Sequence, residues 1–171
     1  MPSEGHCWLV GMMGVGKSTV GRRLATMAGR PFVDLDALVA AEAGCAIDEI
    51  FAREGEEGFR SRERRLLARV AAGPPGVVAT GGGAVLDDAN VAAMRRSGLV
   101  VLLEATIPTL VARVGGGGRP LLEGTDPRVR LTELAAARRA RYEAAADLVV
   151  DTEGREVATI AEEILERWIG S

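Results

Sequence analysis

The chain has 171 residues, of which 47% are hydrophobic and 26% are charged, and its formal net charge is −3. This length predicts one domain that buries roughly two-thirds of its unfolded surface. The slight acidic excess excludes a nucleic-acid binder that depends on a broad basic surface. No apolar run approaches the ~20 residues of a membrane span, and no secretory leader pattern is recognisable. We therefore expect a cytoplasmic protein that binds neither nucleic acid nor membrane.

Short apolar runs alternate with longer amphipathic runs, which is typical of a parallel α/β sheet. Most of the short runs are continuously apolar, as expected for strands that helices cover on both faces. The predicted strands are Cys7–Val10, Pro31–Leu35, Gly76–Thr80, Leu99–Leu103 and Asp147–Val150. The predicted helices are Lys17–Ala28, Ala37–Ala43, Ile47–Arg53, Glu57–Ala72, Asp88–Arg96, Thr109–Val114, Pro127–Ala146 and Glu156–Ile169. No repeat or long linker divides the chain, so a single domain over 1–171 is expected.

The first predicted strand leads into GMMGVGKST, from Gly11 to Thr19, which matches the phosphate-loop pattern G-x-x-x-x-G-K-[ST]. Backbone N–H groups at the start of the following helix can bind phosphate, and the helix dipole favours negative charge there. Lys17 is the only lysine among the 21 basic residues, and its compact ammonium suits a phosphate cradle better than a broad guanidinium does. The pattern predicts that Lys17 contacts the β- and γ-phosphates and that Ser18 offers its hydroxyl to Mg²⁺.

Two carboxylates, Asp34 and Asp36, follow at the end of the second predicted strand. Their spacing predicts that both project from one face of that strand, at the edge of a parallel sheet where ligands bind. Because two anions on one face repel, we expect a division of roles. Asp34 would hold metal-bound water, and Asp36 would accept a proton or hydrogen bond from a substrate hydroxyl. The alternative is that Asp36 merely caps the helix that begins at Ala37.

Arg60 and Glu63 lie three residues apart in the predicted helix Glu57–Ala72, so the acid can hold the guanidinium in one direction. An arginine oriented in this way suits bidentate capture of a carboxylate. Taken alone, an ion pair on a solvated helix face is the simpler interpretation.

Two glycine-rich segments follow. The run Gly81–Gly83 comes directly after a predicted strand, and three glycines, where a tight turn needs one, predict a backbone that touches substrate. The segment RVGGGGRPLLEGTDP, from Arg113 to Pro127, predicts a flap that closes over transferring phosphate. Its Arg119 would stabilise charge on the γ-phosphoryl group. The alternative is a disordered surface loop.

In combination these segments resemble the shikimate kinase family, of the nucleoside-monophosphate-kinase-like group of phosphate-loop proteins. The resemblance runs from Gly11 to about Arg155 and rests on GMMGVGKST, DLD, GCAIDEIFAREGEEGFRSRE, GGG, RPLL and RRARYEAAADLVVDT, in that order. It implies a three-layer α/β fold with a five-stranded parallel sheet in the order 2-3-1-4-5, flanked by helices. It also implies a substrate-binding subdomain at about 34–62 and a lid at about 113–126.

The implied reaction is ATP-dependent phosphorylation of the shikimate 3-hydroxyl, a step of chorismate and aromatic amino acid biosynthesis, with Mg²⁺ as cofactor. The expected partners are shikimate and ATP, and a monomer is expected. By this resemblance ATP would be bound by Gly14, Val15, Gly16, Lys17, Ser18, Thr19, Arg119 and Arg155. Mg²⁺ would be held by Ser18 and, through water, by Asp34. Shikimate would be bound by Asp36, Arg60, Gly82 and Arg138, and the catalytic residues would be Lys17, Asp36 as general base, and Arg119.

Some assignments stay open at this point. The family usually has R-x-P-x-Y where this chain has RRARY, so Arg138, four residues before Tyr142, is the better match and Arg139 is an alternative. No proline follows Arg155, which leaves the path of the adenine loop undetermined. A gluconate kinase shares the loop and the small size, but the DLD, FR and GGG segments favour shikimate. A catalytically silent nucleotide-binding module is disfavoured because Lys17, Ser18, Asp34, Asp36 and Arg119 occur together.

Overall fold

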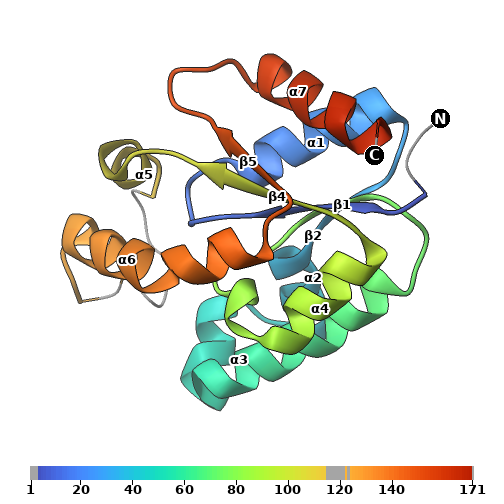
Figure 1. The fold of residues 1–171 in the computed structure, drawn as a ribbon. Helices are drawn as coiled ribbons and strands as arrows, with labels where there is room; N and C mark the ends of the chain where they lie inside the picture. The colour runs from blue at the N-terminus through green and yellow to red at the C-terminus, as the bar shows by residue number, and fades with distance from the viewer. Residues whose placement is uncertain (1–3, 115–121, 123, 171) are drawn as a thin grey trace.

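The computed structural model describes residues 4–114, 122 and 124–170. Within these residues five parallel strands form one sheet in the order β2-β3-β1-β4-β5, as predicted (Figure 1). The strands are β1 (His6–Val10), β2 (Phe32–Asp34), β3 (Val77–Ala79), β4 (Gly98–Glu104) and β5 (Leu148–Asp151). The second strand is shorter than predicted because Leu35 already begins the next helix.

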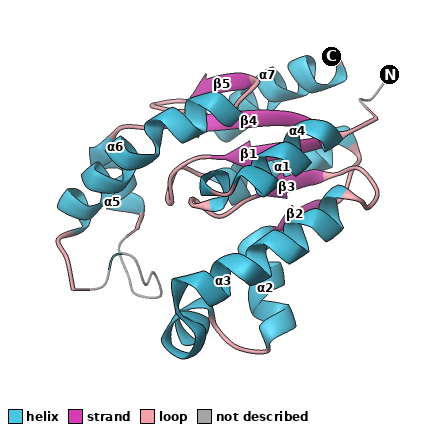
Figure 2. Cartoon of the chain, turned by 60° about the horizontal axis from the view of Figure 1, so that its bottom comes forward, coloured by secondary structure: helices cyan, strands magenta, loops and turns pink. Residues whose placement is uncertain are grey.

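The helices flank this sheet, which confirms the predicted three-layer arrangement. They are α1 (Lys17–Ala28), α2 (Leu35–Ala43), α3 (Ile47–Ala71), α4 (Asp88–Ser97), α5 (Ile107–Arg113), α6 (Pro127–Ala145) and α7 (Val157–Ile169), with a 3₁₀ turn, η1, at Ala84–Leu86. Helices α1 and α7 pack together on one face, and α3 and α4 pack together on the other (Figure 1). Figure 2 shows α2 and α3 side by side next to the β2 edge of the sheet.

The strand β1 lies at the centre of the sheet because it pairs on both sides. Cys7 pairs with Val77 of β3 on one side and with Leu99 of β4 on the other. All five residues of β1 are buried, and the continuously apolar run Cys7–Val10 predicts this for a strand covered on both faces. The loop that follows β1 therefore lies at the middle of the carboxyl edge of the sheet, where ligands bind in open α/β folds.

The long helix α3 contains the break that the sequence predicts. Two helices, Ile47–Arg53 and Glu57–Ala72, were expected here, and Gly55 between them has φ 73° and ψ −179°, far from helical values. Glycine adopts this positive φ without the penalty that a Cβ imposes. The half of α3 after Gly55 carries Arg60 and Glu63, and Leu66 and Leu67 anchor that half in the core.

None of the helices in the described residues combines the length and the apolar composition that crossing a membrane requires.

Candidate active site

The loop after β1 has the backbone geometry of a phosphate cradle. Gly14 and Gly16 have φ values of 82° and 105°, a region that residues with a Cβ rarely enter. Gly16 is the N-cap of α1, so the loop ends where unpaired helix N–H groups begin. The Lys17 ammonium donates to the carbonyl oxygens of Gly11 (2.6 Å) and Met12 (3.0 Å), which places it against the first half of the loop.

The two residues predicted to serve a metal ion lie in direct contact. The Ser18 hydroxyl donates to Oδ2 of Asp34 at 2.9 Å, although the two residues belong to different elements. A hydroxyl and a carboxylate are the hard oxygen donors that Mg²⁺ prefers. Among the described residues no group of three or more His, Cys, Asp or Glu side chains could hold a metal ion. The Ser18 hydroxyl and the Asp34 carboxylate nevertheless fit Mg²⁺, which usually takes one or two protein oxygens and completes its coordination shell with water and phosphate.

The expected placement of Asp36 on a strand is wrong. Asp34 is the last residue of β2 and the N-cap of α2, because its Oδ1 accepts from the backbone N–H of Ala37 at 3.1 Å. Asp36 therefore lies in the first turn of α2, and the capping role belongs to Asp34. The cap starts the helix two residues earlier than predicted, so the two carboxylates do not share a strand face.

Asp34 and Asp36 nevertheless reach the same cavity. This cavity, of about 450 Å³, joins the phosphate loop to the end of β3. Its lining comprises Met13, Gly14, Gly16, Lys17, Ser18, Thr19, Asp34, Asp36, Thr80, Gly81, Gly82 and Arg113. Predicted phosphate-binding and substrate-binding groups thus surround one space.

The glycine run Gly81–Gly83 is packed against the predicted substrate residues. A Cβ on Gly81 would lie 2.7 Å from Asp36 Oδ1 and 3.1 Å from Glu63 Oε2. A Cβ on Gly82 would lie 3.1 Å from Arg138 Nη1, and one on Gly83 would overlap the Arg60 guanidinium. Each glycine therefore leaves space for a charged side chain from another element. Two carboxylates and two guanidiniums converge here on a backbone that bears no side chains.

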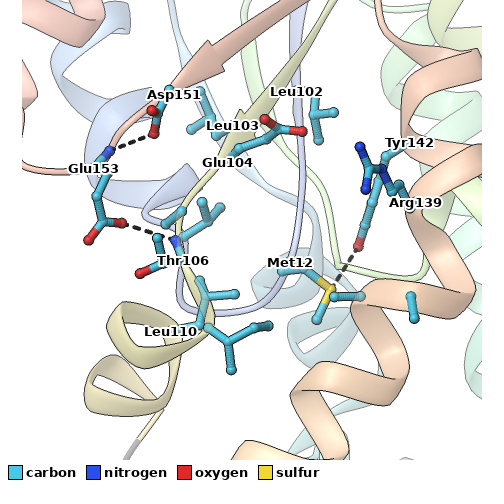
Figure 3. Close-up of a pocket in the computed structure, with 15 residues that line it drawn as sticks. Met12, Leu102, Leu103, Glu104, Thr106, Leu110, Arg139, Tyr142, Asp151 and Glu153 are labelled. Atoms are coloured by element: carbon cyan, nitrogen blue, oxygen red, sulfur yellow. Dashed lines mark hydrogen bonds between the residues drawn. The ribbon is translucent and has the colours of Figure 1, made fainter.

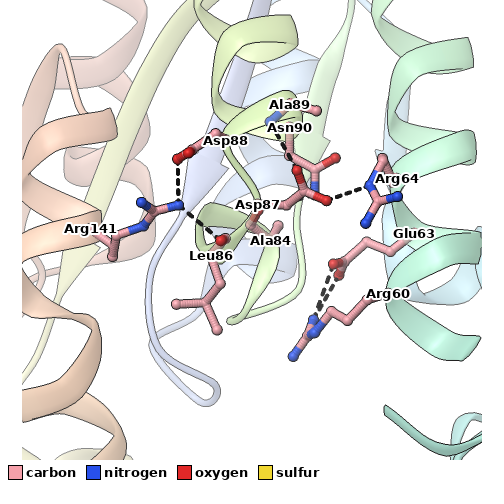
Figure 4. A network of polar contacts seen from close by, with 10 residues as sticks. All are labelled: Arg60, Glu63, Arg64, Ala84, Leu86, Asp87, Asp88, Ala89, Asn90 and Arg141. Atoms are coloured by element: carbon pink, nitrogen blue, oxygen red, sulfur yellow. Dashed lines mark hydrogen bonds and ion pairs between the residues drawn. The ribbon is translucent and has the colours of Figure 1, made fainter. Parts of the chain in front are cut away.

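Arg60 and Glu63 form a partly buried ion pair. Arg60 Nη1 donates to Glu63 Oε1 at 3.1 Å and Oε2 at 3.2 Å (Figure 4). Glu63 is 0% exposed, which rules out the alternative of a solvated pair. Burial raises the pKa of Glu63 to about 7, and the negative charge of Asp36 adds to the rise, while Arg60 opposes it. The acid holds the guanidinium in one direction, as the spacing predicts.

The neighbouring residues Arg138 and Arg139 face different surroundings. Arg138 is 3% exposed, and its Nη1 is buried with no hydrogen-bond partner among the described residues. The side chain of Arg139 is 81% exposed and pairs with Glu143 at 3.0 Å. A buried cationic donor without a partner is costly, so the Arg138 position suits an anionic ligand. The geometry favours Arg138 over Arg139 as a substrate residue.

The phosphate loop also borders a second, smaller cavity of about 240 Å³, which two arginines line. Its lining comprises Val15, Gly16, Thr19, Val20, Arg113, Thr152, Arg155, Val157 and Ile160. Arg113 Nη1 donates to the carbonyls of Gly14 (3.3 Å) and Val15 (3.1 Å). Arg155 donates to the carbonyl of Asp151 at 2.9 Å and pairs with Glu163 at 2.6 Å. Arg155 thus lies beside the loop, as an adenine-binding role requires.

The contacts of Arg113 could not be predicted from the sequence, in which this residue is only the first of the predicted flap. No local pattern marks them, because the partners lie 99 and 98 residues earlier in the chain. The predicted lid residue Arg119 lies outside the described residues, as does most of the predicted lid.

A further cavity, of about 560 Å³, lies between α5 and α6, next to the ends of β4 and β5 (Figure 3). Its wall is mostly apolar, with Met12, Leu102, Leu103 and Leu110 among its members. Of the predicted site residues that the structure describes, this lining includes Val15 alone. It is therefore a weaker candidate for the reaction centre than the cavity that Lys17 and Asp36 share.

Tyr142, another residue that sequence reasoning left without a role, connects the two regions. It lines the larger cavity, where its hydroxyl contacts Met12 Sδ at 3.6 Å (Figure 3). The same hydroxyl donates to the carbonyl oxygen of Gly82, in the glycine run.

Comparisons with known proteins agree on one family. The family model described as "Shikimate kinase" matches residues 13–168. The chain is 53% identical over 162 residues to the shikimate kinase of Symbiobacterium thermophilum, covering 93% of each protein. It is 46% identical over 173 residues to that of Moorella thermoacetica, covering 98% of each.

Solved structures show the same relationship. The structure titled "Shikimate kinase from Acinetobacter baumannii in complex with shikimate" has a TM-score of 0.92 and 35% identity, and the match covers 95% of this chain and 92% of that one. A gluconokinase from Sinorhizobium meliloti has a TM-score of 0.60 and 20% identity, which shows a shared fold alone.

Proposed function

The chain belongs to the shikimate kinase family, and from this premise we propose that it transfers the γ-phosphoryl group of ATP to the 3-hydroxyl of shikimate. The products are shikimate 3-phosphate and ADP. One observation carries the proposal beyond family membership: Asp36, Arg60 and Arg138 converge on the glycine run beside the phosphate loop. A nucleotide site is thereby joined to a pocket for a small, hydroxylated carboxylic acid.

The partly buried Arg60 guanidinium and the buried Arg138 guanidinium would supply the site for the shikimate carboxylate. Arg60 is held by Glu63, and Arg138 has a buried donor without a partner among the described residues. Charge-assisted hydrogen bonds from both arginines would offset the loss of hydration of one carboxylate. The Gly82 N–H would bind another polar group of the ring, since no side chain at that position blocks its approach.

Asp36 is the proposed general base. It lines the cavity that also contains Lys17, so it can accept the proton of the 3-hydroxyl while that oxygen faces the γ-phosphate. Phosphoryl transfer needs little covalent chemistry from the protein, and most of the acceleration comes from positioning and charge neutralisation. Lys17 supplies one of the positive charges. Arg119 remains the predicted lid cation.

The nucleotide would extend from the loop towards α7. The backbone and side chains of Gly14–Thr19 would bind the phosphates, and the adenine would occupy the cavity that Arg113 and Arg155 border. Mg²⁺, when bound, neutralises charge on the β- and γ-phosphates. The Ser18 hydroxyl and, through water, the Asp34 carboxylate would hold it there.

Other properties remain predictions from the sequence. These are a monomeric, cytoplasmic enzyme that binds neither nucleic acid nor membrane, the substrate-binding subdomain at about 34–62 and the lid at about 113–126.

The function is tested by supplying the purified protein with Mg·ATP and one acceptor at a time. We expect ADP release with shikimate and none with gluconate, because gluconate is also a hydroxylated carboxylate but is acyclic and cannot hold its hydroxyls as the shikimate ring does. Phosphorus NMR of the product should show a phosphate monoester on the 3-oxygen. Equal turnover of both acceptors, or of neither, contradicts the proposal.

The role of Asp36 is tested by Asp36→Asn, which keeps the shape of the side chain and removes its basicity. We expect kcat to fall by about 10²- to 10⁴-fold, with the KM for ATP within about twofold of wild type. Asp34→Asn is the matched control, because it should change the Mg²⁺ requirement instead. A loss for Asp36→Asn that appears mainly in the KM for ATP would show that Asp36 is not the base.

A further inference from the structure

Arg141 makes hydrogen bonds that the proposed mechanism does not explain. It lies in α6, and its Nε donates to the carbonyl oxygen of Val85 at 3.1 Å. Its Nη2 donates to the carbonyl oxygen of Leu86 at 2.9 Å and to Asp88 Oδ1 at 2.7 Å (Figure 4). These acceptors belong to η1 and to the first residue of α4. One guanidinium thus joins α6 to the segment that directly follows the glycine run.

The bond from Arg141 to the Val85 carbonyl is the best shielded of the three, because it is partly buried whereas the bonds to Leu86 and Asp88 are exposed. The Asp88 side chain is 90% exposed, so its ion pair with Arg141 contributes little in water. The carbonyls of Val85 and Leu86 lie at the end of a three-residue 3₁₀ turn, where carbonyl groups lack partners within the turn. A charged donor makes stronger bonds to such carbonyls than a neutral one does.

Other residues already hold η1 and the start of α4 on the side of α3. The Asn90 side chain donates to the carbonyl of Ala84 at 3.1 Å. Asp87 caps α4 and pairs with Arg64 of α3 (Figure 4). Loss of Arg141 would therefore leave η1 attached to α3 and α4 and release it only from α6.

The face of α6 that carries Arg141 also carries the substrate arginine. Arg138, Arg141 and Tyr142 are spaced i, i+3 and i+4, which places them on one side of the helix. Tyr142 donates to the carbonyl of Gly82, and a Cβ on Gly82 would lie 3.1 Å from Arg138 Nη1. The glycine run and η1 thus lie along this face, held by Tyr142 at one point and by Arg141 at another.

We propose that Arg141 is a positioning residue for shikimate binding. By attaching η1 to α6 it acts together with the Tyr142 bond to Gly82 to set the distance between the Gly82 N–H and the Arg138 guanidinium, which the proposed function assigns to different parts of one substrate. This inference rests on that function. Arg141 lines none of the three cavities described above, so its effect should reach shikimate and leave ATP unaffected.

The test is Arg141→Met, which keeps the apolar stem of the side chain and removes every donor. We expect the KM for shikimate to rise roughly tenfold or more while the KM for ATP stays within about twofold. The dissociation constant for shikimate, measured by calorimetry without ATP, should rise in parallel. Arg141→Lys keeps one charged donor and should restore part of the loss. Asp88→Asn, which removes only the exposed contact, should change little.

Arg139→Met is the matched control, since it removes an arginine and an ion pair from the exposed side of the same helix. It should leave both KM values within about twofold of wild type. Equal effects of Arg139→Met and Arg141→Met, or equal rises in the two KM values for Arg141→Met, overturn the inference. If Arg141→Met does not fold, Arg141→Lys decides: a severalfold rise in the shikimate KM alone supports the inference, and unchanged kinetics overturn it.

Shikimate turnover by the wild-type protein distinguishes a failure of this inference from a failure of the proposed function. Absence of shikimate turnover by the wild type overturns the proposed function and this inference with it. Normal wild-type turnover together with unselective effects of Arg141→Met overturns the inference alone.

Discussion

At the scale of single residues, Glu63 affects the charge of the proposed shikimate pocket near neutral pH. The carboxyl is fully buried, and burial raises its pKa to about 7. Asp36 raises the pKa further, whereas Arg60 and Arg138 oppose the rise. The pocket therefore gains one positive charge as the pH falls through about 7, because Glu63 then ceases to neutralise Arg60.

This shift predicts a pH dependence of shikimate binding. A carboxylate substrate stays ionised above pH ~5, so it should bind more tightly when Glu63 is protonated. The KM for shikimate should fall as the pH decreases from 8 to 6, and Glu63→Gln should flatten this profile without changing that of the KM for ATP. The stability of the fold should change with pH in the same direction. Protonation of Glu63 stabilises the folded state, and this contribution is lost as the pH rises through about 7. Identical shikimate profiles for wild type and Glu63→Gln would contradict the assignment.

At the scale of elements, the connection from β3 to η1 is shaped by the side chains that pack against it. The backbone of Gly83 has φ −97°, which any residue can adopt. Glycine is needed here for steric reasons and not for its backbone conformation, since a Cβ at this position would overlap the Arg60 guanidinium. This clash involves the far end of a flexible side chain, so the protein can relieve it by moving Arg60.

Gly83→Ala should therefore weaken shikimate binding more than it lowers the stability of the fold. Displacing the Arg60 guanidinium should raise the KM for shikimate roughly tenfold or more, while thermal unfolding shifts by only a few degrees. Gly73→Ala is the control, because Gly73 is an exposed loop glycine whose Cβ would have its nearest neighbour at 3.3 Å. A large loss of stability without a change in the shikimate KM would show that the glycine serves packing alone.

At the scale of the whole molecule, the strand order puts the residues proposed for the two substrates on either side of β1. The β2–β3 side provides Asp34, Asp36 and the glycine run, and the β4–β5 side leads to Arg113 and Arg155. The phosphate loop lies between them. A chain with a net charge of −3 would bind the two proposed anionic substrates through cations at these few positions rather than through a broad basic field.

Much of this arrangement is predictable from the sequence because it depends on neighbours along the chain. Strands and helices follow from apolar periodicity, the phosphate loop from the strand–glycine–helix pattern, and the Arg60–Glu63 pair from its helical spacing. The element that contains Asp36 could not be predicted from the sequence, because the short segment around this residue is compatible with both the end of a strand and the first turn of a helix. The Asp34 cap decides between these two conformations.

The sequence by itself determined the sheet, the phosphate loop and, through the family resemblance, the acceptor that the site should bind. Only the tertiary structure decided that Arg138 is buried and Arg139 exposed, that Glu63 is buried, and that Arg113 contacts the loop. The physical reason is that burial and hydrogen-bond partners depend on segments distant in the chain. Neighbouring arginines with the same local pattern acquire different surroundings only when α6 packs against the glycine run.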